Sequence, residues 1–291
     1  MSARYPSPTK ERPGSLTSGR LQQVVSGPDE AIDLAEAALL IATHVYPDLD
    51  VAHYLARIEE LAKTLESRIQ PDSGPSQRIL ALNEYLFAEL GFAANKEDYY
   101  DPRNSCLNDV LDRRVGIPIT LSLLYMEVGG RIGLPLQGVS FPGHFLVKCA
   151  LPDGTVMLDP YSGGISIGVA DLQKRLGEAR DGEVSSAIVA GMLVAAGKKE
   201  IILRLLRNLK AIYLRSQKFD RALPILDWII ATVPDQPPEL RDRGMIYQEL
   251  ECPRAALADF ERYLELSPRC DDRDQIRSRI VELQRQSARL N

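Results

Sequence analysis

The residues of this sequence best suited to chemistry are a histidine and an aspartate near the middle of the chain. His144 and Asp159 belong to two apolar runs that are separated by Pro152-Asp153-Gly154. Such runs around a turn predict a β-hairpin. If the hairpin closes around the Pro-Asp or the Asp-Gly step, both side chains lie on the same sheet face, a diagonal step or two apart. The pattern predicts a histidine–carboxylate pair, in which the carboxylate fixes the tautomer of the imidazole.

The thiols offer no obvious partner for this pair. They are Cys106, Cys149, Cys252 and Cys270, and no two have CxxC spacing. The scarce histidines and cysteines do not cluster as zinc ligands would, so the sequence predicts no metal site, no cofactor and reduced thiols in a cytosolic-type compartment. Cys149 lies five positions after His144 on one strand and therefore faces the other side, into the core.

Helices followed by an antiparallel sheet are expected to position the pair. Helical spacing of apolar residues covers residues 28–47, 55–65, 79–90 and 118–133. Residues 95–118 are polar and irregular, which predicts a loop with a short helix. After Gly133 the period changes to two, and the expected strands cover residues 136–141, 144–150 and 155–158. This order is typical of an α+β domain.

The last third of the chain repeats with a period of 34 residues. The matching pairs are Tyr213 and Tyr247, Ala222 and Ala256, Leu226 and Phe260, and Pro234 and Pro268. This period, with small, aromatic and proline positions, is typical of tetratricopeptide repeats. We predict repeats at about residues 203–236 and 237–270, with a closing helix over 272–289 that covers the last hydrophobic face.

Composition disfavours two classes of partner. The 291 residues include 35 basic and 40 acidic ones, for a formal charge of -5, so no global positive field attracts nucleic acid. No apolar run reaches the roughly 18 residues that a membrane span needs. Residues 1–27 are rich in serine and basic residues and contain Pro6, Pro8 and Pro13, which predicts a disordered polar tail. A segment that targets the chain to an organelle is the alternative to a cytoplasmic protein.

Three motifs carry a family resemblance. They are NSCLNDVLDRRVGIPITLS at residues 104–122, Phe141-Pro142-Gly143-His144-Phe145, and Leu158-Asp159-Pro160. Together they resemble the SirB-one family, which joins a transglutaminase-like domain to tetratricopeptide repeats. In the wider transglutaminase and papain-like superfamily, a cysteine at a helix start is the nucleophile, a histidine on a later strand is its base, and an aspartate orients the histidine. His144 and Asp159 match the last two members.

The resemblance places the nucleophile near Pro118, which carries no thiol. Cys106, about twelve residues earlier, reaches His144 only if the loop from Asn104 folds back over the helix start. Thr120 or Ser122 as the nucleophile needs a stronger base and an oxyanion hole. The His144–Asp159 pair is then either a remnant site for a polar ligand or a structural hydrogen bond.

Further residues are candidates for binding. The pocket beside the pair is expected to include Asn104, Arg113, Arg114, Pro118 and Thr120, because guanidinium groups suit a carboxylate or amide. On the first helices of the repeats, the basic set is Arg204, Arg207, Lys210, Arg241 and Arg243. Arg207 and Arg241 are candidate contacts for an acidic peptide, and a solvated face is the alternative.

We therefore predict a transglutaminase-like domain at residues 28–180 and a helical-repeat segment at residues 181–291. The favoured hypothesis is a non-catalytic pseudoenzyme that acts as a protein-interaction or regulatory module and binds a protein or peptide. A second hypothesis is a hydrolase or acyltransferase that uses His144 and Asp159 with Cys106 or another nucleophile. A third is one rigid body with a structural role, whose groove is filled internally.

Overall fold

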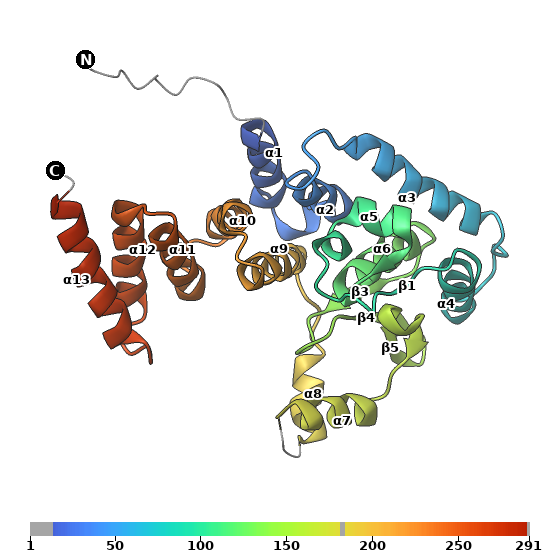
Figure 1. Cartoon of the computed structure of the whole chain (residues 1–291). Helices are drawn as coiled ribbons and strands as arrows, with labels where there is room; N and C mark the ends of the chain where they lie inside the picture. The colour runs from blue at the N-terminus through green and yellow to red at the C-terminus, as the bar shows by residue number, and fades with distance from the viewer. Residues whose placement is uncertain (1–13, 181–183, 290–291) are drawn as a thin grey trace.

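A small antiparallel sheet packs against one long buried helix, and further helices surround both (Figure 1). The computed structural model describes residues 14–180 and 184–289. The sheet has the order β3-β4-β5-β6, with β3 Leu136–Val139, β4 Leu146–Leu151, β5 Gly154–Asp159 and β6 Ile165–Ser166. The α+β class that the sequence predicts is confirmed.

The register of the central hairpin follows from its turn. Leu151 lies opposite Gly154 and Val147 lies opposite Leu158, so the chain reverses at Pro152-Asp153. This is the first of the two closures that the sequence allows. It brings the end of β5, with Asp159, back toward the turn before β4 that contains His144.

The buried helix is α6, Pro118–Arg131. Proline is tolerated at its first position because the N–H that proline lacks has no helical acceptor there. The Thr120 hydroxyl accepts the Ile117 N–H, at 3.1 Å, and so completes the cap. The residues of α6 are apolar on nearly every side, which is typical of a helix inside a core.

Four helices lie in the first part of the chain; three of them pack against α6, and the first packs against the second. They are α1 Gly14–Ser26, α2 Leu34–Ala42, α3 Val51–Glu66 and α4 Pro75–Asn83. Helix α1 corrects the prediction of a disordered tail for the part of residues 1–27 that the structure describes. Leu21 and Val25, one helical turn apart, are buried against the core, and the three prolines precede the helix. Residues 1–13 lie outside the described residues.

The stretch between α4 and α6 contains short elements that the sequence pattern did not resolve. They are the π-helical turn η2 Glu84–Glu89, β1 Ala93–Ala94, the 3-10 turn η3 Pro102–Ser105, helix α5 Leu107–Arg113 and β2 Val115–Gly116. Strands β1 and β2 pair in parallel, with Ala93 opposite Val115. This pairing fixes both ends of the loop and short helix that were predicted for residues 95–118.

After β5, the short turn η4 Pro160–Ser162 and strand β6 lead to helices α7 Val169–Arg180 and α8 Ser186–Met192. Leu172 and Leu176 of α7 and Val189 of α8 share a small core with Val139 of β3 and with Phe141, which follows that strand. Helix α8 follows the predicted domain limit at residue 180 and nevertheless packs with the sheet.

The repeats form successive helical hairpins that extend away from the sheet (Figure 1). The helices are α9 Lys198–Arg215, α10 Phe219–Thr232, α11 Pro237–Glu249, α12 Pro253–Leu266 and α13 Arg273–Arg289. Ala222 and Ala256 are completely buried, as close helix approach requires. The Phe260 ring lies so close to Gly244 that a Cβ there would be 2.7 Å from it. Among the described residues, no helix is long and apolar enough to cross a membrane.

The first repeat shares the main hydrophobic core with the helices around α6. Leu206 and Leu209 of α9 and Ile229 of α10 belong to the same buried cluster as residues of α2 and α6. At the start of α9, the Asp29 carboxylate of the turn η1 Asp29–Ala31 accepts the backbone N–H groups of Lys198 and Lys199, at 2.7 and 2.8 Å. A residue 169 positions away therefore caps this helix.

Replacing Asp29 by alanine should destabilise the whole chain by about 1 kcal/mol, because the first N–H groups of α9 lose their acceptors. Urea denaturation of the full chain measures this change. Asp29→Asn keeps one acceptor oxygen and should fall between the alanine variant and wild type. Equal midpoints for wild type and Asp29→Ala would show that the cap has no effect on stability.

His44 follows α2 and packs against the first repeat. Its protonation should make the free energy of unfolding depend on pH. Its ring contacts Tyr213 and Trp228 edge-on, with centroids 5.9 and 5.8 Å apart. Burial, and then the Arg221 charge, lower the pKa of His44 below its ordinary value of 6.5. The unfolded chain therefore binds a proton at His44 more readily than the folded chain does.

The free energy of unfolding should consequently fall as the pH decreases from about 7 to 5.5, because protons favour the unfolded state in that window. His44→Phe keeps an aromatic ring at the site and should flatten this dependence. Urea titrations at several pH values provide the measurement. The same slope in the variant would assign the dependence to other groups.

Candidate functional site

The His144–Asp159 pair forms at the mouth of the hairpin. His144 lies in a turn that precedes β4, not within the strand as predicted, because Gly143 has a φ of 69° and the His144 N–H donates to the Phe141 carbonyl at 3.0 Å. The His144 Nε2 is 2.8 Å from the Asp159 Oδ1. The expected hydrogen bond is present, and Nδ1 is the ring nitrogen that it leaves for another partner.

Asp159 is completely buried and receives hydrogen bonds at both oxygens. Its Oδ2 accepts from the Ser162 hydroxyl at 2.9 Å and from the Arg175 Nη1 at 3.2 Å. Burial by itself would raise the pKa of the Asp159 carboxyl, but the hydrogen bonds from His144, Ser162 and Arg175 outweigh it and lower that pKa. The carboxylate is therefore ionised at neutral pH. Sequence reasoning missed Ser162 and Arg175, because no spacing rule links the turn η4 or helix α7 to the hairpin.

Arg204 of α9 holds the loop that carries His144. Its Nη1 donates to the Ser140 hydroxyl at 2.7 Å, and its Nη2 donates to the carbonyls of Phe141 and His144 at 3.0 and 2.6 Å. Burial lowers the pKa of the Arg204 guanidinium below its ordinary value. The sequence placed Arg204 with the basic residues of the repeat groove, whereas it faces the transglutaminase-like part.

Around the position expected for the nucleophile, the structure has a proline and two hydroxyl groups that already have hydrogen-bond partners. Pro118 is the first residue of α6 and is buried. The Thr120 hydroxyl is shared between Ile117 and the Asn104 carbonyl, to which it donates at 2.8 Å. The Ser122 hydroxyl lies 3.4 Å from the Phe145 carbonyl and is completely buried.

The described contacts of Cys106 do not include His144 or Asp159, and its thiol is held in the less nucleophilic, protonated form. Its Sγ is completely buried at the start of α5, 3.6 Å from the Pro102 carbonyl. Burial, and then the charges of Asp109 and Asp101, raise the pKa of the Cys106 thiol to about 12. The thiol is therefore protonated at neutral pH, and the thiolate is the nucleophilic form.

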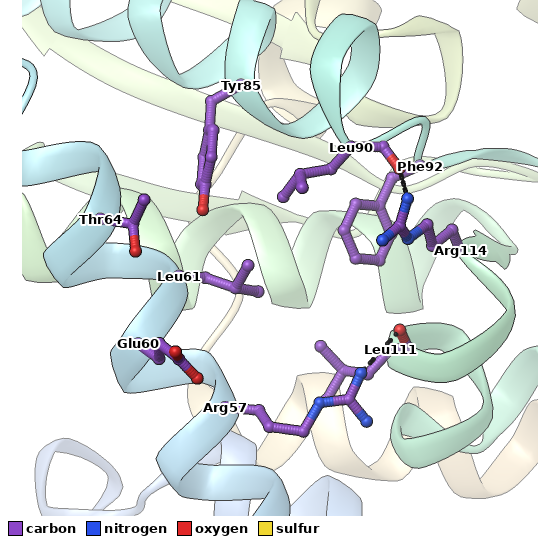
Figure 2. A pocket seen from close by; sticks show the side chains of 9 residues that line it. All are labelled: Arg57, Glu60, Leu61, Thr64, Tyr85, Leu90, Phe92, Leu111 and Arg114. Atoms are coloured by element: carbon purple, nitrogen blue, oxygen red, sulfur yellow. Dashed lines mark hydrogen bonds between the residues drawn. The ribbon is translucent and has the colours of Figure 1, made fainter.

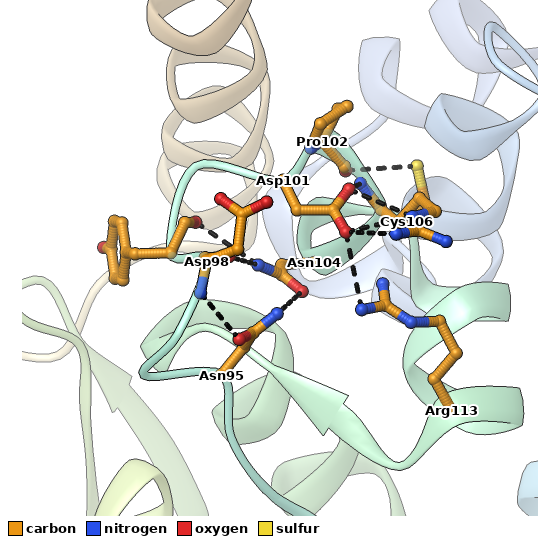
Figure 3. A network of polar contacts seen from close by, with 9 residues as sticks. Asn95, Asp98, Asp101, Pro102, Asn104, Cys106 and Arg113 are labelled. Carbon is orange, nitrogen blue, oxygen red and sulfur yellow. Dashed lines mark hydrogen bonds and ion pairs between the residues drawn. The ribbon is translucent and has the colours of Figure 1, made fainter.

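Asn104 and Arg113 belong to a polar network near the start of α6 (Figure 3). Among the described residues, His144 is not part of this network. The buried Asn104 donates to the carbonyls of Asp98 and Tyr99, at 2.7 and 3.3 Å, and accepts from Asn95 at 3.0 Å. Arg113 pairs with Asp101 at 3.4 Å. Arg114 points elsewhere, into a cavity beside α3. Of the five residues predicted to share one pocket, Asn104 and Arg113 thus belong to this network and Arg114 belongs to a separate cavity.

The basic residues of the repeats form ion pairs within the chain. Arg207 contacts Glu239 at 2.7 Å, and Lys210 contacts Asp242 at 2.7 Å. The other pairs join Arg241 to Asp242 and Asp272, and Arg243 to Asp227 and Asp259. The cationic side chains that were candidates for binding an acidic peptide are thus already paired with carboxylates of the chain itself. Within residues 14–180 and 184–289, no group of His, Cys, Asp and Glu side chains is arranged to hold a metal ion.

Comparison with known proteins agrees with this architecture. Residues 52–207 match the transglutaminase-like superfamily model, and residues 209–281 match a tetratricopeptide repeat model. A UPF0162 protein of Xylella fastidiosa is 41% identical over 256 residues, which cover 88% of this chain and 91% of that protein. The UPF0162 protein YchA of Escherichia coli is 29% identical over 239 residues, 81% of this chain and 86% of YchA.

A more distant similarity links the chain to a eukaryotic protein. F-box only protein 21 of Mus musculus is 30% identical over 186 residues, which cover 60% of this chain and 28% of that protein. No solved structure matches the chain significantly. The match over more than half of the sequence, together with relatives that align along most of their length, shows that this chain belongs to the transglutaminase-like superfamily and to its UPF0162 proteins.

Proposed function

We propose that this protein is a non-catalytic transglutaminase-like and tetratricopeptide module that binds a partner protein. The observation that carries the proposal is that neither candidate position supplies a reactive thiol: Pro118 begins α6, and the Cys106 thiol is buried and protonated at neutral pH. We also infer, from the three sequence motifs, that the chain is a member of the SirB-one family, and we expect it to act in the cytoplasm.

The His144–Asp159 pair has a structural role in this proposal. Asp159 is fully buried and ionised, and an ionised carboxylate inside a protein needs several donors to offset the loss of water. His144, Ser162 and Arg175 supply them from three different segments. The pair thus fixes the end of the hairpin to η4 and α7, whether or not it acts on a substrate.

The surface that we propose for the partner is the loop before η3. Tyr99 and Tyr100 are 39% and 50% exposed and contact each other edge-on. The Arg215 guanidinium of α9 lies 4.2 Å from the centre of the Tyr100 ring. Tyrosine and arginine are enriched among the residues that dominate binding energy, and the bonds from Asn104 hold this loop in place before a partner arrives. Arg207 and Arg241 serve to join successive repeats.

Alkylation of the native chain tests the missing nucleophile. With iodoacetamide at neutral pH, the exposed Cys252 should react quickly, and Cys106 should react on the order of a thousandfold more slowly because so little of it is thiolate. Mass spectrometry of digested samples measures both rates. Rapid labelling of Cys106 that His144→Ala abolishes would reject the proposal.

That outcome would favour the alternative, a hydrolase or acyltransferase with Cys106 as nucleophile. The observation that favours it is the oriented imidazole, whose Nε2 is bound to Asp159 so that Nδ1 is left as a base. Under this alternative, His144→Ala and Asp159→Asn would abolish activity while a Ser162→Ala variant, which keeps His144, would retain most of it.

Substitution of Tyr100 by alanine should weaken partner binding at least tenfold, since it removes an exposed aromatic anchor without touching the core. Quantitative affinity capture with the intact chain measures the loss. Val281→Ala, on the 46% exposed Val281 of α13, is the matched control and should bind like wild type. Equal capture by all three chains would place the partner on another surface.

A further inference from the structure

A cavity of about 210 Å³ lies between α3, the π-helical turn η2 and α5, away from the His144–Asp159 pair (Figure 2). Apolar side chains of Leu61, Leu90, Phe92 and Leu111 point into it. Its volume equals that of roughly seven water molecules, and it is smaller than the pockets that hold drug-sized ligands. A ligand for this site therefore has a short apolar body.

Two arginines border the cavity, and their charges are balanced differently. Arg57 forms an ion pair with Asp112 and donates to the Leu111 carbonyl at 3.2 Å. Arg114 donates from Nη1 to the Leu90 carbonyl at 2.8 Å, and within residues 14–180 and 184–289 this is the one hydrogen bond that its guanidinium makes. No carboxylate of the described residues pairs with Arg114. Its remaining N–H groups are available to a ligand.

The backbone of Arg114 places its side chain at the cavity. With φ of 59° and ψ of 24°, Arg114 adopts the left-handed conformation at the end of α5 that favours glycine. An arginine at such a position is strained. Gln217, Asp235 and Glu251 have the same conformation, which is a common way to end a helix; at Arg114 it leaves the guanidinium within reach of the Leu90 carbonyl at the end of η2.

The opposite wall contains the third feature. In η2 the Leu90 N–H reaches back five residues to the Tyr85 carbonyl, at 3.0 Å, so this turn is wider than an α-helix. Single π-helical turns occur frequently at functional sites. This one places Tyr85 and Leu90 on the same cavity, and the carbonyl of Leu90 holds Arg114.

We propose that this cavity binds a small monocarboxylate with an apolar chain of a few carbons. The carboxylate is held by the free N–H groups of Arg114, whose planar fork matches two oxygens, and the chain lies against Leu61, Leu90 and Phe92. Glu60 also lines the cavity, and its carboxylate opposes a dianion more strongly than a monoanion. The site does not depend on the function proposed above.

Isothermal titration of the full chain with sodium hexanoate tests the proposal. Wild type should bind saturably, and Arg114→Gly should bind at least tenfold more weakly. Glycine is unstrained at this φ, so the variant should melt no lower than wild type, which separates loss of ligand from loss of fold. Arg114→Lys, which keeps the charge and loses the fork, should have intermediate affinity.

Two further ligands complete the test. Hexylammonium, which has the opposite charge, should not bind. N-acetyl-leucine distinguishes two sources of the carboxylate. If it binds more tightly than hexanoate, the natural ligand is the end of a peptide, and if it binds more weakly, the natural ligand is a free acid. Equal hexanoate affinity in wild type and Arg114→Gly, preference for hexylammonium, or no saturable binding of either carboxylate would overturn the proposal.

Discussion

Helix α9 is the constraint on which the arrangement of the two parts depends. Its apolar face, with Leu206 and Leu209, lies in the same core as α2 and α6, and its first N–H groups are capped by Asp29 from the other end of the chain. The same helix supplies Arg204, which holds the loop of His144. A repeat array normally contacts its own neighbours alone. Here the first hairpin needs the transglutaminase-like helices to cover its hydrophobic side.

The repeats show why the number of basic residues on a helix does not by itself identify a surface that binds acidic peptides. Glu239 is 3% exposed, and a buried carboxylate is costly unless cations compensate it. Arg207 and Lys210 lie on the preceding first helix of a repeat and provide this compensation. The cations are therefore used to join α9 to α11, and an acidic peptide would have to displace carboxylates that are already in place.

The periodic parts of this chain were predictable because each follows from a local rule. The 34-residue period identified Ala222, Ala256 and Phe260 as buried contacts, and both hairpin closures that the turn residues allow bring His144 near Asp159. Helix α1 was missed because three prolines before it dominated the composition of the segment. The turn η2 continues the apolar spacing of α4, so the sequence pattern does not distinguish it from an α-helix.

The destinations of single long side chains were beyond such rules. Arg113 and Arg114 are neighbours, yet one meets Asp101 and the other meets the Leu90 carbonyl. Helix α5 ends between them, and the change of φ to 59° at Arg114 turns the chain toward β2. Arg175 reaches Asp159 only because α7 folds back over the sheet. Such contacts depend on tertiary packing and are invisible to spacing.

A histidine bound to a buried carboxylate is weak evidence of catalysis when the carboxylate has other duties. If Asp159 served only to orient His144, one hydrogen bond would suffice, whereas it accepts three from separate segments. Removing any one donor would leave an ionised group less compensated in the interior, at a cost of about 1 to 3 kcal/mol. Stability by itself therefore accounts for His144 in a chain whose candidate thiol, Cys106, is buried and protonated. Evidence for catalysis has to come from a reactive group facing Nδ1, the nitrogen that Asp159 leaves free.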